Sequence, residues 1–426
     1  MREDFLHYLW KFKKFDTSNL FTVRREPIII IHSGNYLQLS GPDFFNAQLI
    51  IGNQKWAGNI EIHVKSSDWY AHHHETDAAY DNVILHVVWE HDAAVFRKNN
   101  TEIPVLEIRH FVNCTLLENF KTLTAAKSWI YCEKQLGTVD DFLLKNWLER
   151  LYFERLQNKI EPIRSLLTQT NQDWEAVLFC MLAKNFGLNT NGEAFMKIAS
   201  QIPFAIVRKE SHNQTRIEAL LFGFANLLIA DNEDTYFHEL KNNFTTLAQK
   251  YNLPSPAPVT VEFFKHRPDN FPTVRLSQFA ALYSTSHSLF SKIIDASSTK
   301  FLYSIFEVDA SKYWQNHYQF DRESPAKRKP LSKSFIDLLI VNTVVPIKFA
   351  YAQSIGKDNS DELGALLSEI KPESNAIVDK FGLHSVRCSN VFESQALLQL
   401  KNEYCAKGKC LDCAIGISLL KESENG

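Results

Sequence analysis

The sequence predicts an α+β protein: a small mixed β-sheet domain over residues 1–135, followed by a large, mostly helical region over residues 136–426. Before Thr138, short apolar or alternating runs lie between turn residues, a pattern typical of strands. After it, apolar residues recur at helical spacing and strand signals are few. The chain of 426 residues has 45% apolar content, enough for two or three domains with sizeable cores.

The first element is predicted to be an amphipathic helix over residues 4–14, because Phe5, Leu9 and Phe12 recur at helical spacing. Strands are expected after it, at residues 27–32, 36–39, 44–51, 55–65, 83–90 and 105–108. Gly52-Asn53 predicts a tight hairpin turn between two of them. The polar, histidine-rich residues 68–82 are expected to form a loop or a short helix.

The rest of the chain is predicted to be helical. Helices are expected at residues 139–168, 172–186, 193–200, 213–231, 234–251, 275–295 and 333–353. Asp173 ahead of Trp174 is a helix-start signal. Residues 252–260 are a proline-rich connector, and residues 320–334 form a charged loop.

Composition and charge limit the classes of protein. A net charge of −3 argues against a uniformly basic coat for nucleic acid, although it leaves room for a local basic groove. The N-terminal residues lack the apolar core of a signal peptide, and no long uncharged apolar stretch occurs. We therefore expect a cytoplasmic protein without a membrane span. Its seven cysteines should stay reduced, so a cysteine cluster would indicate metal ligation.

The most reactive set of side chains is predicted around the hairpin. Alternate residues share a face of a strand, so Glu61, His63 and Lys65 lie together. A symmetric hairpin centred near Asn53 places Asp43 opposite His63, and one bulge would shift that register. Two carboxylates so placed suit Mg²⁺ or Mn²⁺, which can activate water and neutralise charge on a phosphate. His63 and Lys65 would then assist the attacking water.

More histidines follow the hairpin. His72 and His74 are expected to contact a substrate phosphate or, with His63, to bind zinc, although consecutive side chains do not converge easily on one ion. His86 lies in an apolar strand, where its ring needs a buried partner, so we expect it behind the catalytic residues or simply in the core. The alternative for the whole set is the exposed polar face of an ordinary sheet.

Four cysteines lie close together near the C-terminus: Cys388, Cys405, Cys410 and Cys413. Thiolates at this spacing suit Zn²⁺ or an iron–sulfur cluster. The alternative is that they are small buried residues at a helix end. The remaining cysteines, Cys114, Cys132 and Cys180, have apolar neighbours and are expected in the core.

One loop in the helical region could contact phosphate. Arg267 and Arg275 flank a segment with two prolines, and the planar guanidinium suits phosphate oxygens. The alternative is a helix-entry loop whose arginines pair with nearby acids. The basic run 327–329 is expected to be solvated surface. The motifs of common nucleotide-binding proteins, zinc proteases and serine hydrolases do not occur.

Several sequence blocks carry a resemblance to known proteins. GPDF, GNIEIH, SSDWYAHHH and AYDNVILHVV resemble a bacterial family named only domain-of-unknown-function family 2851, and HRPDNFPTVR, VNTVVP and YCAKGKCLDCAIG extend the resemblance over nearly the whole chain. The order of elements also resembles the core of PD-(D/E)xK nucleases. On that comparison Pro42-Asp43 and Glu61 match the acidic positions, and His63 occupies the lysine position, with Lys65 two residues further on.

These observations favour a metal-dependent, nuclease-like phosphodiesterase that acts on nucleic acid, with a restriction-endonuclease-like sheet domain. Asp43 and Glu61 would hold the ion, and the helical region would shape a substrate channel. Two alternatives remain. One is a non-catalytic scaffold that binds nucleic acid or protein. The other is a zinc-dependent hydrolase built from His63, His72, His74 and His86.

Overall fold

A computed structural model describes residues 1–36, 41–125, 128–230, 232–264 and 266–421. The chain divides into two compact units. The first unit comprises Met1–Trp147, Lys380–Val386 and Leu400–Gly426, and the second comprises Leu148–Asp379 and Arg387–Gln399. The predicted α+β class, with an N-terminal sheet and a large helical region, is confirmed. The C-terminal segment, which the sequence had assigned to the helical region, belongs to the first unit.

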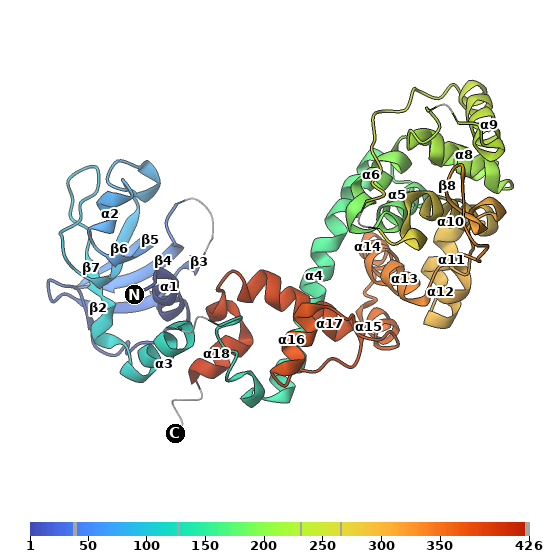
Figure 1. Ribbon diagram of the computed structural model, residues 1–426. Coiled ribbons are helices and arrows are strands. Elements are labelled where there is room, and N and C mark those ends of the chain that lie inside the picture. The colour runs from blue at the N-terminus through green and yellow to red at the C-terminus, as the bar shows by residue number, and fades with distance from the viewer. Residues whose placement is uncertain (37–40, 126–127, 231, 265, 422–426) are drawn as a thin grey trace. The chain divides into compact units, whose positions relative to one another are not determined.

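The described residues of the first unit contain a seven-stranded mixed sheet in the order β1-β2-β4-β5-β6-β7, with β3 paired to β4 (Figure 1). The strands are β1 (Leu20–Phe21), β2 (Pro27–His32), β3 (Asn35–Tyr36), β4 (Phe44–Ile51), β5 (Gln54–Lys65), β6 (Val83–Glu90) and β7 (Val105–Glu107). Pairing is antiparallel as far as β5 and parallel for β5–β6 and β6–β7. Parallel neighbours need a crossover, which the short helix α2 (Asp68–Ala71) and its flanking loops supply between β5 and β6, and residues 91–104 supply between β6 and β7. Residues 37–39 of the predicted strand 36–39 lie outside the described residues.

The β4–β5 hairpin sets the geometry of the site. Ile51 pairs with Gln54 across the predicted two-residue turn, where Gly52 has a φ of 61°. A bulge follows between Phe44 and Ala47, so that Phe44 pairs with Ile60. The predicted register, with Asp43 opposite His63, is therefore wrong. The bulge moves Asp43 beside Glu61 instead.

Both faces of β5 are covered, which explains why its polar residues are buried. Helix α1 (Glu3–Phe12) contacts β5 and buries Phe5, Leu9 and Trp10 completely. A second apolar cluster, around Trp69 and Tyr80, packs where the crossover returns to the sheet. Full burial of one such side chain contributes about 2–3 kcal/mol. The alternative prediction was that these residues form the exposed polar face of an ordinary sheet. In the described part of β5, Glu61 and His63 are buried, so this alternative does not hold for them.

Other helices complete the first unit. Helix α18 (Ala414–Lys421) packs against α3 (Cys114–Ala125), and the Asn119 side chain donates a hydrogen bond to the carbonyl of Leu420. This contact ties the C-terminal segment to the N-terminal sheet domain.

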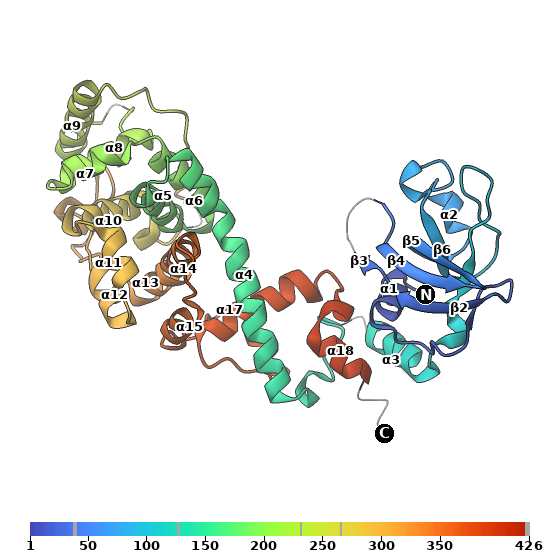
Figure 2. The ribbon, with the colours of Figure 1, turned by 180° about the vertical axis from the view of Figure 1, so that it is seen from behind.

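The second unit is built from helices, and α5 contacts both α6 and α10 (Figure 2). Its helices are α4 (Asp141–Gln169, which begins in the first unit), α5 (Trp174–Phe186), α6 (Leu188–Ser200), α7 (Phe204–Glu210), α8 (Gln214–Phe224), α9 (Thr235–Tyr251), α10 (Pro272–Thr285), α11 (Leu289–Asp295), α12 (Thr299–Ile305), α13 (Lys333–Leu339), α14 (Val345–Ser354), α15 (Ser360–Ser368), α16 (Ala376–Leu383, which ends in the first unit) and α17 (Val391–Gln399). A small hairpin of β8 (His317–Gln319) and β9 (Arg322–Glu323) overlaps the start of the predicted charged loop 320–334, with only β9 inside it. The Asp173 carboxylate caps α5, as predicted, by accepting the N–H of Ala176.

Several predicted helices differ in detail from the structure: the predicted helix 193–200 begins already at Leu188, and the predicted helix 213–231 ends at Phe224. The predicted helix 275–295 is two helices, α10 and α11, separated where Ser288 takes a φ of 52°. The segment Lys333–Ser354 contains α13, a π-helical turn and α14. It is long and apolar enough to cross a membrane, but 78% of its most apolar window is buried within the protein. A core helix of a soluble protein has the same length and composition.

Candidate metal centre

Asp43 and Glu61 meet at the start of the β4–β5 hairpin. The backbone N–H of Asp43 donates to Oε2 of Glu61 at 3.2 Å, and the N–H of Ile62 donates to Oδ2 of Asp43 at 2.9 Å. Glu61 is 5% exposed. Burial and the nearby charge of Asp43 raise the pKa of Glu61 well above its ordinary value. The two carboxylates therefore lie close enough to serve one site, and they repel each other unless a proton or a cation lies between them.

His7 adds an imidazole that the sequence analysis missed. Its Nε2 lies 3.2 Å from Oδ2 of Asp43. Burial lowers the pKa of His7, but the hydrogen bond and charge of Asp43 raise it further, so the net shift is upward. The sequence signal that could have pointed to His7 is its spacing from Glu3. The two residues are four apart and therefore share one face of α1.

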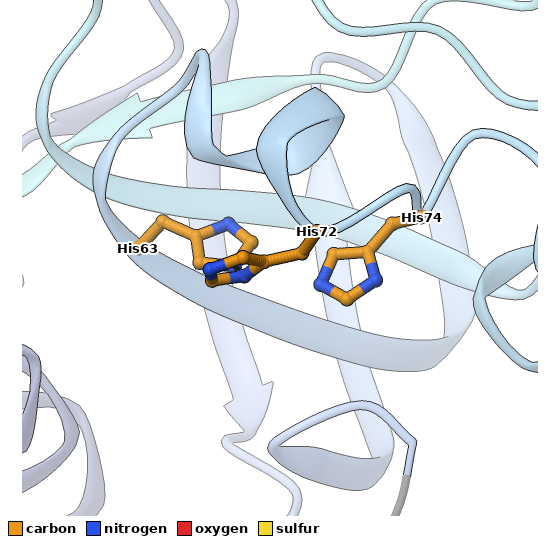
Figure 3. A group of neighbouring side chains, drawn as sticks. All are labelled: His63, His72 and His74. Carbon is orange, nitrogen blue, oxygen red and sulfur yellow. Dashed lines mark hydrogen bonds between the residues drawn. The ribbon is translucent and has the colours of Figure 1, made fainter.

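Three further imidazoles converge beside Glu61. One ligand nitrogen from each of His63, His72 and His74 lies within 4.8 Å of the others, and their rings gather at one point (Figure 3). Nε2 of His63 is 3.0 Å from Nδ1 of His72. Oε1 of Glu61 is 3.4 Å from Nε2 of His63 and 3.3 Å from Nε2 of His74. We call Glu61 and these three histidines the histidine–carboxylate cluster.

Local structure explains why residues 72 and 74 can both reach the cluster. His72 ends the short helix α2, and His73 takes a left-handed φ of 60°. This reversal exposes the His73 side chain and turns His74 back, where its ring stacks on Tyr80 at 3.7 Å. Consecutive side chains do not converge here: His73 points away from the cluster, and only the alternate residues His72 and His74 reach it.

His86 lies behind the cluster, as the sequence analysis expected. It is fully buried, and its Nε2 lies 2.9 Å from Nδ1 of His63. Burial lowers the pKa of His86 to about 3, and burial with the surrounding imidazoles lowers the pKa of His63 to about 2. Both rings are therefore neutral at pH 7. A neutral imidazole has a free nitrogen lone pair, which a metal ligand requires.

The donor set fits a divalent cation of intermediate hardness. Three imidazole nitrogens with one carboxylate suit Zn²⁺, and also Mn²⁺ with Asp43 alongside. Mg²⁺ prefers a shell of oxygens, which this cluster does not supply. His86 contacts the ring of His63 and Tyr80 stacks on the ring of His74, as supporting residues do in metal sites. His72 is the exposed member, so one side of the cluster is open to solvent.

Lys65 is not brought into the cluster. Four residues beyond Glu61 on the same strand, it lies about 13 Å further along. Its side chain is exposed, and no hydrogen bond or ion pair among the described residues links its ammonium to the cluster. A role for Lys65 beside an attacking water has no support from this geometry.

The other predicted site residues lie elsewhere. Arg267 and Arg275 line a cavity in the second unit, where Arg275 is 6% exposed. Cys405, Cys410 and Cys413 line a small cavity in the first unit together with Cys132, which the sequence analysis had placed in the core. Cys388 belongs to the second unit and is not among the residues that line this cavity.

Comparison with known proteins identifies the family. Residues 3–376 match the family described as a protein of unknown function (DUF2851), and the chain belongs to this family. The matched residues include the whole histidine–carboxylate cluster and end before the C-terminal cysteines. No curated protein and no solved structure matches the chain.

Proposed function

We propose that the first unit is a divalent-metal-dependent phosphodiesterase of nuclease type that acts on nucleic acid. The observation that carries this proposal is the convergence of His63, His72 and His74 within 4.8 Å of one another, with the carboxylate of Glu61 within 3.4 Å of two of them. Four potential ligands from two separate segments of chain, strand β5 and the turn after α2, make a built site. A charged surface patch would not bury two of them.

Each residue has a definite task in this proposal. Glu61, His63, His72 and His74 hold the ion, and His86 fixes the ring of His63. When bound, a divalent ion supplies an activated water and a counter-charge for the phosphate. The exposed side of His72 is where a substrate phosphate can approach.

Asp43 and His7 supply the acid–base group. Oδ2 of Asp43 is fixed by the N–H of Ile62 and faces Nε2 of His7 at 3.2 Å. The carboxylate orients the imidazole and stabilises its protonated form, so His7 can accept a proton from the attacking water. Burial lowers the pKa of His7, but the hydrogen bond and charge of Asp43 outweigh it and raise the pKa above its ordinary value.

The order of elements supports a phosphodiester substrate. Helix α1, a strand entered at Pro42-Asp43, a strand with Glu61 and a parallel strand after a crossover resemble the core of PD-(D/E)xK nucleases. His63 stands where those enzymes have lysine. This departure makes the site richer in nitrogen and moves its preference from Mg²⁺ toward Zn²⁺ or Mn²⁺.

The same departure favours a second candidate, a zinc-dependent hydrolase that cleaves another kind of ester or amide. Three imidazoles and a carboxylate around zinc would serve either chemistry. The two candidates share the cluster and differ only in substrate, so the substrate assay separates them.

Metal titration tests the cluster first. The metal-stripped full chain is titrated with Zn²⁺, Mn²⁺ and Mg²⁺ while its melting temperature is followed. Binding at a hundred times Kd should contribute about 2.7 kcal/mol. We expect a response to Zn²⁺ or Mn²⁺ in wild type and a much weaker response in His72→Asn. His73→Asn is the matched control, because asparagine tolerates the left-handed backbone and His73 is outside the cluster.

Cleavage assays then test the reaction. The metal-loaded chain is incubated with bis(p-nitrophenyl) phosphate and with single- and double-stranded DNA and RNA. Metal-dependent cleavage that is lost in Asp43→Asn and kept in His73→Asn supports the nuclease. Cleavage of carboxylic esters or peptides alone would move the assignment to the second candidate. Nucleic-acid binding without turnover by any metal-loaded form would refute catalysis and leave a scaffold.

A further inference from the structure

Four cysteines in the first unit surround one small cavity of about 10 Å³: Cys132, Cys405, Cys410 and Cys413. Cys132 comes from a segment more than 270 residues earlier in the chain, so the fold brings it to the other three. All four are free thiols. Each of the six pairs among them is close enough for mutual electrostatic interaction. A cavity of this size holds one water-sized body.

From this arrangement we infer that Cys132, Cys405, Cys410 and Cys413 form a four-thiolate site for a thiophilic metal centre, either Zn²⁺ or an iron–sulfur cluster. Tetrathiolate ligation is the chemistry that both share. The site is independent of the histidine–carboxylate cluster and of the function proposed for it.

The surroundings of Cys413 suit a metal-bound thiolate. Its sulfur accepts hydrogen bonds from the backbone N–H groups of Ile415 and Gly416 and from the indole of Trp147. Burial raises the pKa of the Cys413 thiol, and these three donors partly offset that rise and orient the sulfur, as supporting residues do around metal ligands. A neutral thiol in an apolar core needs no such environment.

Gly416 makes this packing possible. A Cβ on Gly416 would lie 2.2 Å from the carbonyl oxygen of Cys410. No side chain fits there, so only glycine lets the start of α18 approach the Cys410 loop closely enough to place both thiols on the same cavity. Gly408, at a φ of 65°, forms the turn between Cys405 and Cys410.

Cations surround the thiols. Burial raises the pKa of both Cys410 and Cys405, and the positive charges of Arg2 and Lys401, respectively, oppose that rise. Lys409 lines the cavity itself. Four thiolates around Zn²⁺ carry a net charge of about −2, and nearby cations offset that charge.

The spacing of the thiols leaves both kinds of centre open. Among the described residues, only the histidine triad has three ligand atoms that all lie within 4.8 Å of one another. Zn–S bonds of about 2.3 Å place tetrahedral thiolates about 3.8 Å apart. Zinc would therefore draw the thiols inward, whereas an iron–sulfur cluster would hold them further apart.

Metal analysis of the intact chain tests the site. The full chain is isolated without oxygen in a His72→Asn background, so that the histidine–carboxylate cluster contributes little metal. Zinc, iron and acid-labile sulfide are measured per chain. We expect one zinc, or iron with sulfide and visible absorption, and loss of most of it in Cys132→Ser. Cys388→Ser is the matched control and should keep the metal.

Thiol protection makes the test independent of variant folding. In the wild-type chain, alkylation mapped by mass spectrometry should spare the four thiols when Zn²⁺ is bound and label them after chelation. Cys114, which is exposed, should be labelled in both states. Equal labelling of the four thiols with and without Zn²⁺ or reconstituted iron and sulfide would overturn the inference. So would retention of metal by Cys132→Ser together with its loss from Cys388→Ser.

A separate observation in the second unit carries a second inference. A cavity of about 510 Å³ is lined by five cationic residues, among them Arg267, Arg275 and Lys329, and by a single acid, Asp269. Arg275 is 6% exposed, and its Nε has no hydrogen-bond partner among the described atoms. We infer that this cavity binds a small ligand that carries phosphoryl groups. Its volume is that of a nucleotide-sized site.

The contacts of Arg275 explain the preference for an anion. Its terminal nitrogens donate to the side-chain oxygens of Gln278 and Asn270, and its guanidinium lies 3.6 Å from the centre of the Phe335 ring. No ion pair to Arg275 occurs among the described residues. The predicted alternative, arginines paired with nearby acids, therefore does not hold for Arg275. A buried, unpaired guanidinium gains most from an anionic partner.

Calorimetric titration with phosphate, pyrophosphate, ATP and a short oligonucleotide tests this site and distinguishes the sources of the phosphoryl group. Arg267→Gln, on the exposed rim, should weaken binding about tenfold. Lys300→Gln, an exposed cation that does not line the cavity, is the matched control and should bind like wild type. Failure of all four probes to bind, or equal weakening in both variants, would overturn the inference.

Discussion

Nε2 of His63 and Nδ1 of His72 lie 3.0 Å apart, although His63 is buried in the sheet and His72 is exposed at the end of α2. At this distance one ring nitrogen donates a hydrogen bond to the other, and a metal ion bound by both rings would replace that hydrogen bond. The contact therefore joins a buried potential ligand to an accessible one.

Metal binding should release a proton from Glu61. Burial and Asp43 raise the pKa of this carboxyl, so it is protonated at neutral pH without metal and must ionise to bind one. Zn²⁺ affinity should therefore increase as pH rises toward that raised pKa. Calorimetry in two buffers of different ionisation enthalpy measures the released protons. Glu61→Gln should release fewer, and an unchanged count would exclude Glu61 as a ligand.

The same pKa shift has a consequence for stability. Because the folded-state pKa of Glu61 is raised, stability is highest below the unfolded pKa, near 4.5, and falls as pH rises through the folded value. Urea unfolding of the metal-free chain from pH 5 to pH 8 should show this loss of stability. In Glu61→Gln the slope should be smaller. A stability that rises equally with pH in both chains would contradict the assignment.

His86 should act as a positioning residue for the metal. Its Nε2 holds Nδ1 of His63 at 2.9 Å and so directs the other nitrogen of that ring toward the cluster. His86→Leu places an apolar side chain in this buried position and removes the hydrogen bond to His63. Zn²⁺ affinity should therefore fall by about 10- to 100-fold. Competition with a fluorescent chelator measures the change. An unchanged affinity together with a lower melting temperature would mean that His86 only fills the core.

The fold class could be predicted from local sequence because each region has one dominant hydrophobic periodicity, that of strands before Thr138 and that of helices after it. The apolar run of β6 and the Gly52-Asn53 turn are local features, and both occur where the sequence indicates them. The bulge that pairs Phe44 with Ile60 is not local. It depends on Asn46 taking a φ of 59°, which asparagine tolerates but does not require. The partner of Asp43 was therefore beyond prediction from the sequence.

The same limit applies to the ligands. Glu61, His63 and His86 are fixed by strand alternation, and sequence reasoning could group them. His7 joins them through tertiary packing of α1, and Cys132 meets Cys410 only because the C-terminal segment returns to the first unit. Periodicity reports which face a residue occupies within its own element. It says nothing about which distant element covers that face.

Glu218 should be a main determinant of stability in the second unit. It is fully buried and accepts hydrogen bonds from Ser277 at 2.6 Å and Tyr236 at 2.7 Å, with the indole of Trp314 at 3.3 Å. Glu218→Ala leaves these donors buried without an acceptor, so it should cost about 3–5 kcal/mol. Urea unfolding followed by circular dichroism measures the loss. Glu193→Ala, at an exposed ion pair with Lys184, should change stability by about 0.5 kcal/mol or less.

Gly223 and Gly364 should respond in opposite ways to the same substitution. Both lie inside helices, where alanine normally gains about 1 kcal/mol over glycine. A Cβ on Gly223 would lie 2.3 Å from the ring of Phe244, which packs α9 against α8, so Gly223→Ala should destabilise the unit by about 1–3 kcal/mol. A Cβ on Gly364 meets no atom within 4 Å, so Gly364→Ala should stabilise it. Urea unfolding of both variants checks the signs, and a stabilised Gly223→Ala would mean that the close approach of α8 to Phe244 is absent in solution.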